Sequence, residues 1–499
     1  ALARPLVAGQ ARAGQAIERR SPGRADVAVG RAIDASDADV RDAIAAAAAV
    51  HETWAAVPVA RRAQVLEAWA DALEARLEPL TALGVWEAGR TVADAVADVR
   101  EAVDFCRYYA VQARRLFGEP DPLPGVTGES NELRWRGRGP FVSISPWNFP
   151  VAIFVGQIAA ALVAGNPVLA KPAEQTPLTA QAAIEPALDA LARLGLPAAA
   201  LQLLPGPGET VGAALTADPA IAGVVFTGSN ATAKRIQQAL LAHDEIKPLI
   251  AETGGQNAMI VDSTALPEQV VDAVISSGFR SAGQRCSALR VLYLQHEIAD
   301  ELQRMIEGAM ATLAVGDPSD PATDVGPVID DSARAALVAH LDSLHARGRR
   351  IVRTPLPGGL NGTYVAPALV EIDGIGELDR EHFGPIVHVA RFAIDDLDAV
   401  IAAINAMRYG LTLGIHTRID ARARYVAARA RVGNVYVNRN IVGAVVGSQP
   451  FGGEGLSGTG FKAGGPSYLL RFAAEQVVTV NTAAAGGNLA LLAAAERQR

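Results

Sequence analysis

Apolar residues recur every three or four positions in the first part of the chain, with polar residues between them. This spacing predicts amphipathic helices, because it gathers the apolar side chains on one face of each helix. Ser36 is a suitable N-cap for the first helix, and Asp39 falls in its first turn. The predicted helices cover residues 37–56, 61–77 and 92–116, and a loop rich in proline and glycine follows at 118–128.

The pattern changes at Phe141, where short apolar runs begin to alternate with helical stretches. Such alternation is typical of βαβ units that build a parallel sheet. Two stretches of this kind follow each other, and the second runs from 268 to 437. The predicted strands are 167–170, 201–204, 223–226, 259–261 and 290–294, the predicted helices are 150–164, 176–194, 231–242, 267–279 and 298–313, and residues 131–144 and 470–480 are predicted to be extended.

Size and composition narrow the class of protein. The chain has 499 residues, of which 50% are hydrophobic and 20% charged, so it is long enough for two or three globular domains. The formal net charge of −8 is spread along the chain without a basic stripe, which argues against nucleic-acid binding. The longest apolar run, at 150–164, is too short to span a bilayer, and we expect no signal peptide.

The two cysteines, Cys106 and Cys286, are too few for a disulfide framework, and the cytoplasm is the expected compartment. No cysteines and histidines have metal-ligand spacing, so no metal site is predicted. Cys286 follows Gly283-Gln284-Arg285, and a neighbouring arginine favours the reactive thiolate. A single cysteine is more often a buried packing residue, which is our interpretation of Cys106 in its helix.

Two further residues could take part in chemistry at Cys286. Glu252 follows an apolar strand end, where partial burial raises the pKa of a carboxyl group towards that of a useful general base. The alternative is a capping carboxylate before a glycine turn. Asn148 stands between Trp147 and Phe149, and its amide could donate a hydrogen bond to an oxyanion. An ordinary turn with aromatic core residues would give the same pattern.

Three segments could hold a nucleotide. Lys171 and Glu174 follow a predicted strand, and residues at the carboxyl end of a parallel strand can bind ribose hydroxyls. Gly228 and Ser229 mark a strand-to-helix turn, where N–H groups and a hydroxyl suit a phosphate. The alternatives are a solvated ion pair and a plain helix cap. The loop at 206–208 matches a phosphate loop only loosely, and we interpret it as a turn.

Taken in order, these segments resemble the motifs of the aldehyde dehydrogenase superfamily. The resemblance extends over nearly the whole chain, and the spacing between Glu252 and Cys286 fits it as well. Each motif alone is a weak signal, but seven in one order make chance agreement implausible. The seven motifs are Pro146-Trp147-Asn148-Phe149-Pro150, Lys171-Pro172-Ala173-Glu174, Phe226-Thr227-Gly228-Ser229, Glu252-Thr253-Gly254-Gly255, Gly283-Gln284-Arg285-Cys286, Glu381-His382-Phe383-Gly384-Pro385 and Pro450-Phe451-Gly452-Gly453.

The resemblance implies a role for each matched residue. Cys286 is then the nucleophile, Asn148 forms the oxyanion hole with the Cys286 N–H, and Glu252 activates water for thioester hydrolysis. The implied cofactor is NAD. The residues implied to hold it are Lys171 and Glu174 at the adenosine ribose, Ser229 with Gly228 at the pyrophosphate, Glu381 at the nicotinamide ribose, Phe383 beside the nicotinamide ring, and Trp147 in the same site.

A narrower resemblance concerns the substrate. Residues 443–451 resemble the loop of glutamate-semialdehyde dehydrogenases in which two successive backbone N–H groups hold the substrate's α-carboxylate. Here those groups belong to Gly443 and Ala444. Ser287 fits the same subfamily. The side chains expected to flank the aliphatic part of the substrate are those of Phe149 and Phe451.

The C-terminal tail also resembles a known group. Residues 480–488 resemble the tail of the bifunctional proline-utilisation proteins, in which a proline dehydrogenase domain lies upstream. The present chain would then be an excised or separately encoded half of such a protein. The related tails continue further than Arg499, and whether the last residues are native stays open.

The expected fold is α/β and aldehyde dehydrogenase-like. It comprises a Rossmann-like NAD-binding domain (1–130 with 145–251), a catalytic α/β domain (252–440), a small β oligomerisation arm (131–144 with 470–482) and a C-terminal tail (483–499). The resemblance implies at least a homodimer, with a small-molecule aldehyde as the other partner.

The expected reaction is NAD-dependent oxidation of L-glutamate γ-semialdehyde, the open form of 1-pyrroline-5-carboxylate, to L-glutamate in proline catabolism. Three alternatives stay open: another substrate such as succinate semialdehyde, a catalytically silent binding protein on this fold, and a thiol hydrolase with no redox role. The joint presence of Cys286, Glu252 and Asn148 argues against the silent protein. A hydrolase would leave the predicted NAD residues without a cofactor to hold.

Overall fold

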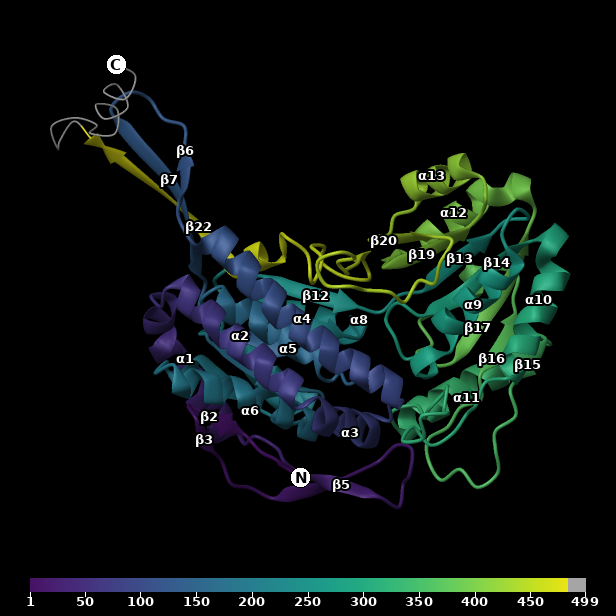
Figure 1. Cartoon of the computed structure of the whole chain (residues 1–499), viewed down its shortest axis with the longest axis horizontal. Helices are drawn as coiled ribbons and strands as arrows, with labels where there is room; N and C mark the ends of the chain where they lie inside the picture. Colours follow the sequence, from purple (N-terminus) through teal and green to yellow (C-terminus); the bar gives the residue numbers. More distant parts are fainter. Residues whose placement is uncertain (483–499) are drawn as a thin grey trace.

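Two α/β bodies lie next to each other along the long axis of the molecule, and a thin β arm projects from one of them (Figure 1). The structure is a computed structural model that describes residues 1–482. The predicted tail at 483–499 lies outside the described residues. Each body is built on a seven-stranded sheet with helices packed on it.

The first sheet is mostly parallel, and β2 and β3 add an antiparallel edge to it. Its central strands are buried on both faces, as parallel strands between helices must be. In spatial order the strands are β12 (Leu249–Thr253), β11 (Gly223–Gly228), β8 (Phe141–Ile144), β9 (Val168–Lys171), β10 (Leu201–Leu203), β2 (Leu6–Val7) and β3 (Gln10–Ala11).

The helices of the first body cover both faces of this sheet, and the longest of them, α4, lies beside α2 and α5 (Figure 1). They are α1 (Asp37–Ala55), α2 (Val59–Ala75), α3 (Leu77–Ala88), α4 (Val92–Phe117), α5 (Ala152–Val163), α6 (Pro177–Arg193), α7 (Ala213–Ala217) and α8 (Asn230–Leu241). Ser36 caps α1 as predicted, because its hydroxyl accepts the Asp39 N–H at 3.2 Å while the Asp39 carboxylate accepts the Ser36 N–H at 2.9 Å.

The second sheet is parallel except for its edge strand β15. In spatial order its strands are β15 (Ile351–Arg353), β16 (Ala368–Glu371), β17 (Ile386–Phe392), β14 (Leu289–Gln295), β13 (Asn257–Val261), β19 (Thr412–His416) and β20 (Asn434–Val437). The helices of this body are α9 (Pro267–Gly278), α10 (His296–Ala311), α11 (Asp331–Ala346), α12 (Leu397–Ala406) and α13 (Asp420–Arg429).

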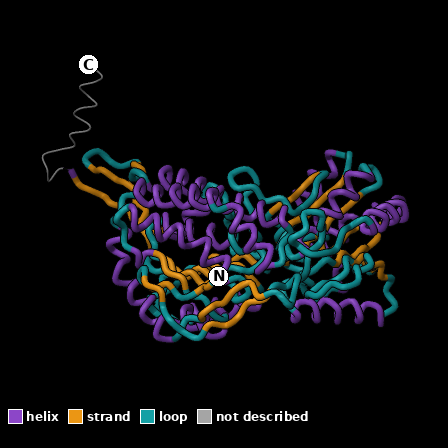
Figure 2. Tube along the Cα trace, turned by 60° about the horizontal axis from the view of Figure 1, so that its bottom comes forward, coloured by secondary structure: helices purple, strands orange, loops and turns teal. Residues whose placement is uncertain are grey.

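The arm is a three-stranded antiparallel sheet in the order β22 (Ala473–Asn481), β7 (Glu129–Gly137) and β6 (Asp121–Leu123). It stands clear of the helices in both views (Figures 1 and 2). The predicted extended segment 131–144 is divided here, and its last part was assigned to the wrong sheet. Residues 141–144 are all buried and form β8 at the centre of the first body, whereas β7 keeps exposed side chains.

Several elements were not predicted. The first 33 residues contribute β2 and β3 and a separate small sheet of β1 (Leu2–Ala3), β5 (Ala28–Ile33) and β4 (Ala16–Arg20). Most of these strands are too short to show a period. Helix α3 was missed because Pro79 and Gly84, which favour helices weakly, interrupt its pattern. A last antiparallel pair joins β18 (Tyr409–Gly410) to β21 (Glu454–Gly455).

The chain crosses from the first sheet to the second between Thr253 and Asn257. Glu252, near the end of β12, therefore lies at the junction of the two bodies. Within residues 1–482, no single helix has both the length and the apolar character needed to cross a membrane. Helices α1 and α2 satisfy these two criteria only when taken together, and the chain bends by 117° between them.

Candidate active site

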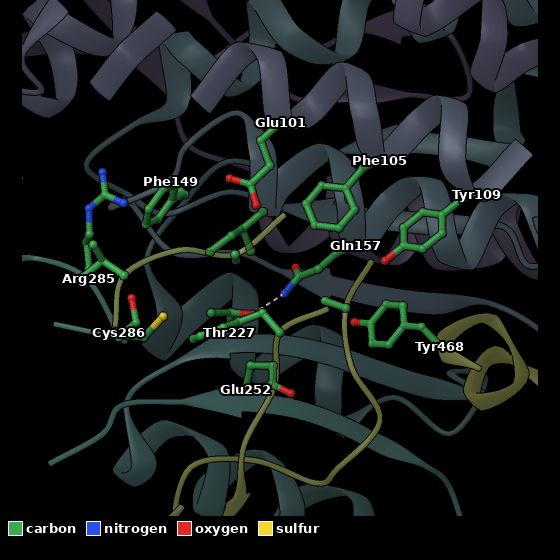
Figure 3. A pocket seen from close by; sticks show the side chains of 17 residues that line it. Glu101, Phe105, Tyr109, Phe149, Gln157, Thr227, Glu252, Arg285, Cys286 and Tyr468 are labelled. Carbon is green, nitrogen blue, oxygen red and sulfur yellow. Dashed lines mark hydrogen bonds between the residues drawn. The ribbon is translucent and has the colours of Figure 1, made fainter. Parts of the chain in front are cut away.

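One cavity at the junction of the two bodies brings together residues that are far apart in the sequence (Figure 3). It contains about 830 Å³ of space that no atom fills, open solvent at its mouth included. Six of the predicted site residues line it: Glu252, Cys286, Ser287, Phe149, Ala444 and Phe451. The other predicted residues lie around it, as described below.

Cys286 follows a loop in an unusual conformation. Ser281, Ala282 and Gly283 all have left-handed backbone angles, with φ of 57°, 53° and 65°. After this loop the Cys286 carbonyl accepts a hydrogen bond of 2.7 Å from the Asn257 amide, which ties the nucleophile to the start of β13. The thiol itself is free and half-buried.

Arg285 lowers the pKa of this thiol as expected, but other groups outweigh it. Burial, together with the nearby carboxylates of Glu381 and Glu252, raises the pKa of the Cys286 thiol to about 12. The Ser287 N–H and Arg285 act in the opposite direction but do not outweigh burial. Figure 3 shows the Arg285 side chain turned away from the sulfur, since its guanidinium pairs with Asp94 at 2.8 Å. The thiol therefore needs a proton acceptor.

Glu252 lines the same cavity as the thiol (Figure 3). Burial raises its pKa well above the ordinary value, while a 3.0 Å hydrogen bond from the Gly453 N–H and the charges of Lys462 and Arg471 act against that rise. A raised pKa makes the carboxylate form a stronger base, which is what removing a proton from water requires. This agrees with the expectation drawn from its place after an apolar strand.

Asn148 lies against the nucleophile loop. Its side-chain Nδ2 donates to the Gln284 carbonyl at 3.2 Å, and its own carbonyl accepts a hydrogen bond from Arg90. The side chain is buried and lines a second, very small cavity together with Trp147 and Gln284. The structure thus places Asn148 next to the loop that precedes Cys286. Its side-chain amide is engaged by a carbonyl of that loop.

Arg290 joins the nucleophile loop to the segment that contains Glu381. This fully buried guanidinium donates from Nη1 to the carbonyls of Gly283 at 2.9 Å and Gly384 at 3.1 Å. From Nη2 it donates to the Arg285 carbonyl at 3.1 Å and to Glu381 Oε1 at 3.3 Å. Burial raises the pKa of Glu381, and this ion pair lowers it in part.

The predicted nicotinamide residues meet at the same place. The rings of Trp147 and Phe383 pack edge to face with centroids 5.6 Å apart, and the Arg290 guanidinium lies 5.2 Å from the Phe383 ring centroid. Gly254 leaves room for Glu381, because a Cβ at Gly254 would come within 1.7 Å of Glu381 Oε2. The two motifs around residues 147 and 383 are therefore in contact.

The remaining predicted NAD residues lie at the carboxyl edge of the first sheet. Lys171 ends β9, is buried, and donates from Nζ to the Pro172 carbonyl at 3.1 Å. Burial lowers its pKa, while Glu174, Glu209 and Asp34 raise it, so its amine has carboxylates nearby. Glu174 is exposed. At the end of β11, Gly228 leads into Ser229, which caps α8 by accepting the Thr232 N–H at 3.2 Å.

The predicted carboxylate loop faces the cavity through Ala444. Its conformation is fixed by a bridge between Val445 and Gln449 and by the hydrogen bond that the Tyr436 hydroxyl donates to the Gly443 carbonyl at 2.8 Å. Within the described residues, the backbone N–H groups of Gly443 and Ala444 donate no hydrogen bond. Two successive N–H groups without partners are what an anion-binding turn requires.

The sequence reasoning missed an acidic row on α4. Asp94, Asp98 and Glu101 follow one another at helical spacing, so they share one face of the helix. Asp94 and Asp98 are buried, and Glu101 lines the cavity, where burial and Asp98 raise its pKa to about 7. The signal was present in the sequence: acidic residues occupy positions that an amphipathic helix normally gives to its apolar face.

Other missed residues form the wall of the cavity next to Glu252. Thr227 pairs with Glu252 in the register of β11 and β12, so their side chains are on the same face of the sheet. The side chains of Gln157 and Thr227 share a hydrogen bond of 2.7 Å (Figure 3). Tyr109 and Tyr468, whose rings stack at 5.9 Å, close this end of the cavity.

Comparison with known proteins agrees with this arrangement. The family model described as the aldehyde dehydrogenase family matches residues 9–478. The chain is 51% identical over 453 residues to the bifunctional protein PutA of Klebsiella aerogenes, covering 89% of this chain and 33% of that protein. It is 34% identical over 478 residues to a 1-pyrroline-5-carboxylate dehydrogenase of Geobacillus sp. (strain WCH70), covering 93% and 90%.

A solved structure of a bifunctional proline utilization A (PutA) protein superposes with a TM-score of 0.87 and 55% identity, covering 91% of this chain and 45% of that one. The chain thus spans about a third of the length of the curated PutA proteins that it matches.

Proposed function

We propose a function for this chain from the premise that it belongs to the aldehyde dehydrogenase family. The proposed reaction is the oxidation of L-glutamate γ-semialdehyde, the open form of 1-pyrroline-5-carboxylate, to L-glutamate with NAD as oxidant. One observation carries the choice of substrate: the cavity that holds the Cys286 thiol is also lined by Ala444 and by Glu101. The loop N–H groups suit an α-carboxylate, and the Glu101 carboxylate suits an α-ammonium group.

The apolar lining suits the methylene groups between these two ends. The apolar side chains that line the cavity with the thiol and Ala444 include those of Phe149, Ile153, Val442 and Phe451. Burying an aliphatic chain contributes about 0.8 kcal/mol per methylene group. An amino-acid aldehyde of short chain length therefore combines the charged and apolar partners that the cavity offers.

The first step is proton transfer from the thiol, whose pKa of about 12 would otherwise leave it unreactive. A water molecule in the cavity accepts this proton and passes it to solvent through the opening of the cavity. The sulfur then forms a bond to the aldehyde carbon, and the carbonyl π electrons move to oxygen. The Cys286 N–H stabilises that oxyanion, together with the Asn148 amide once it leaves the Gln284 carbonyl.

Bound NAD would supply the oxidising power, as the acceptor of the hydride that the former aldehyde carbon loses. The oxyanion then re-forms its carbonyl, which leaves an acyl thioester on Cys286. Glu252 removes a proton from water as the water oxygen bonds to the thioester carbon. The carbon–sulfur bond breaks, the carboxylate product leaves, and the thiolate is restored.

The residues present fit a dinucleotide. Lys171 and Glu174 offer an amine and a carboxylate to ribose hydroxyls, and Ser229 with Gly228 lies at the start of α8, where an anion is favoured. Glu381 would hold the second ribose next to the Trp147 and Phe383 rings. The family is generally NAD(P)-dependent, and the exposed carboxylate of Glu174 supports NAD over NADP.

The wider context of the reaction is also a proposal. The PutA relatives are named bifunctional, which supports an upstream proline dehydrogenase domain in the full-length protein and a place in proline catabolism. The arm of β6, β7 and β22 supports a homodimer or larger assembly. The first body would bind NAD, the second would carry the nucleophile, and the two free cysteines support a cytoplasmic location.

The test is NADH formation, followed by absorbance, with glutamate semialdehyde, succinate semialdehyde and propanal as substrates. We expect glutamate semialdehyde to have the highest kcat/KM and Cys286→Ala to abolish turnover while NAD still binds. Equal efficiency with succinate semialdehyde, which has no amino group, would remove the argument from Glu101. Ester hydrolysis without any NADH formation would support a thiol hydrolase, and the absence of both activities would support a silent binding protein.

A further inference from the structure

The loop before the nucleophile is held in a strained conformation. Left-handed backbone angles are uncommon for residues with a side chain, and here Ser281 and Ala282 adopt them in succession before Gly283 does so as well. Such conformations persist only where surrounding contacts impose them. Because Cys286 follows directly, the position of its sulfur depends on what holds this loop.

Asp94 makes the contacts that hold it. Its Oδ2 accepts a hydrogen bond from the Ser281 hydroxyl at 2.6 Å. Its Oδ1 accepts hydrogen bonds from Arg280 Nε at 2.7 Å and from Arg285 Nη2 at 2.8 Å. Arg285 Nε also donates to the Ser281 hydroxyl at 2.9 Å. One carboxylate therefore binds residues on both sides of the left-handed segment.

Asp94 is suited to this task by its own position. Thr91 caps α4 and Asp94 lies in the first turn, so its backbone is fixed by the helix. Its side chain is fully buried. Burial would raise its pKa, but the guanidinium groups of Arg285, Arg90 and Arg280 hold that pKa below its ordinary value. The carboxylate is therefore a permanent anion at neutral pH.

The same helix also holds the segment that leads into α5. One turn after Asp94, the carboxylate of Asp98 accepts the N–H groups of Val151 at 3.1 Å and Ala152 at 2.9 Å, at the start of α5. Those residues follow the segment that contains Asn148. Helix α4 is thus a common support for the nucleophile loop and for the predicted oxyanion residue.

We propose that Asp94 is a positioning residue for the nucleophile, whose carboxylate fixes the loop at 281–283 and thereby sets the Cys286 sulfur against the aldehyde carbon. Asp94 is not among the residues that line the cavity, so it acts through Ser281 and Arg285 rather than on the substrate. The inference rests on the function proposed above for Cys286.

The test is the pre-steady-state formation of NADH by Asp94→Asn at saturating NAD and substrate. A displaced sulfur lowers the rate constant of the first turnover by about tenfold or more, because small displacements of reacting groups are costly. Loss of folded protein lowers the amplitude and leaves that rate constant unchanged. We expect the rate constant to fall and the dissociation constant of NAD to stay the same.

Two variants keep the test decisive. Glu87→Gln changes another buried carboxyl group, which accepts the N–H groups of Leu178 and Thr179 on α6 and does not contact the nucleophile loop; it should leave the rate constant unchanged. Ser281→Ala removes one contact of Asp94 and should lower the rate constant by a smaller factor. If Asp94→Asn does not fold, Ser281→Ala carries the test alone.

The two effects should also be less than additive in Asp94→Asn with Ser281→Ala, because both changes break one network. An unchanged rate constant in both single variants, or full additivity, would overturn the proposal. If the wild-type chain forms no NADH, the proposed function fails. The rate at which iodoacetamide alkylates Cys286 is then measured instead of NADH formation. A changed alkylation rate in Asp94→Asn but not in Glu87→Gln would then support the positioning role, and equal rates would reject it.

Discussion

Asp94 and Glu252 are two carboxyl groups of the site, and burial acts to raise the pKa of each, yet their surroundings are opposite. Asp94 faces three guanidinium groups, which keep its pKa below the ordinary value. Glu252 accepts one backbone N–H, has its positive charges further away, and has a raised pKa. Burial alone therefore does not decide what a carboxyl group does. With cations in contact it becomes a fixed structural anion, and without them it becomes a proton acceptor.

Among the variants that test this comparison, Glu252→Gln should have the largest effect, and that effect should be on the reaction rate. Glutamine has nearly the shape of glutamate and can still accept the Gly453 N–H through its amide oxygen, so the fold should be nearly unchanged. It cannot accept a proton, so thioester hydrolysis should slow by about a hundredfold or more. A burst of NADH followed by a slow steady state is the expected time course in stopped-flow absorbance.

The pH dependence of thioester hydrolysis by the wild type is a second test of the role of Glu252. Because its pKa is raised, Glu252 gains its basic form only as the pH increases, and thioester hydrolysis should accelerate with pH. Glu252→Gln should lose this dependence. A burst that slows in parallel with the steady state would show that Glu252 acts before hydride transfer instead.

For Asp94→Asn, by contrast, the free energy of unfolding should show the largest change. Removing one partner of a buried ion pair leaves the guanidinium groups uncompensated and costs about 3 kcal/mol in the free energy of unfolding. Since the folded pKa of Asp94 lies below the ordinary 3.8, its contribution is present above that pH and is lost as the pH falls.

The measurement for this variant is urea unfolding at several pH values. The difference between wild type and Asp94→Asn should be full at neutral pH and should shrink below the pKa of an unfolded aspartate, about 4. A variant as stable as the wild type would mean that Asp94 is no fixed anion, and the contrast with Glu252 would disappear.

Glu101 is the third carboxyl group in this comparison. It lies in the cavity wall, and its pKa is about 7. Its carboxylate form increases as the pH rises through 7, so the KM for glutamate semialdehyde should fall over that range. Glu101→Gln should raise this KM by about tenfold and remove its pH dependence, because a charge-assisted hydrogen bond is lost. Propanal, which has no ammonium group, is the control substrate and should show no change.

The smallest effect is expected at the exposed carboxylate of Glu174, where solvent screens the charge. Glu174→Ala should narrow the preference for NAD over NADP by a factor of about three to ten, mostly through a lower KM for NADP, because a like charge near the 2′-phosphate is removed. Steady-state kinetics with both cofactors measure it. Equal use of both cofactors by the wild type would contradict the role of Glu174.

Much of the fold could be predicted because its elements are long enough to show a period. Helices α1, α2 and α4 were predicted from apolar spacing to within two residues at each end. Burial of β8 was not foreseen, since extended residues on either side of Gly139 look alike in sequence but enter different sheets. Pairing partners are set by tertiary contacts, which local patterns do not contain.

Some residues of the site could be predicted and others could not, again because tertiary contacts are not contained in local patterns. Cys286 and Glu252 occupy recognisable motifs, and both line the cavity. The direction in which Arg285 points could not be predicted, because its partner Asp94 lies far away in the chain. Adjacent residues in sequence suggested an arginine that activates the thiol, whereas the folded chain uses that arginine to anchor the loop.

The last described segment has a consequence for how the chain is made. Tyr468 and Phe472 are buried in the core of the first body, and the Asn166 amide donates to the Phe472 carbonyl at 3.0 Å. The second sheet, by contrast, is formed by one continuous stretch from β13 to β20. During synthesis the second body can therefore complete its core first, while the first body waits for residues that emerge near the end. Chains that stop before Tyr468 should expose apolar surface on the first body and require chaperones, rather than simply lack an arm.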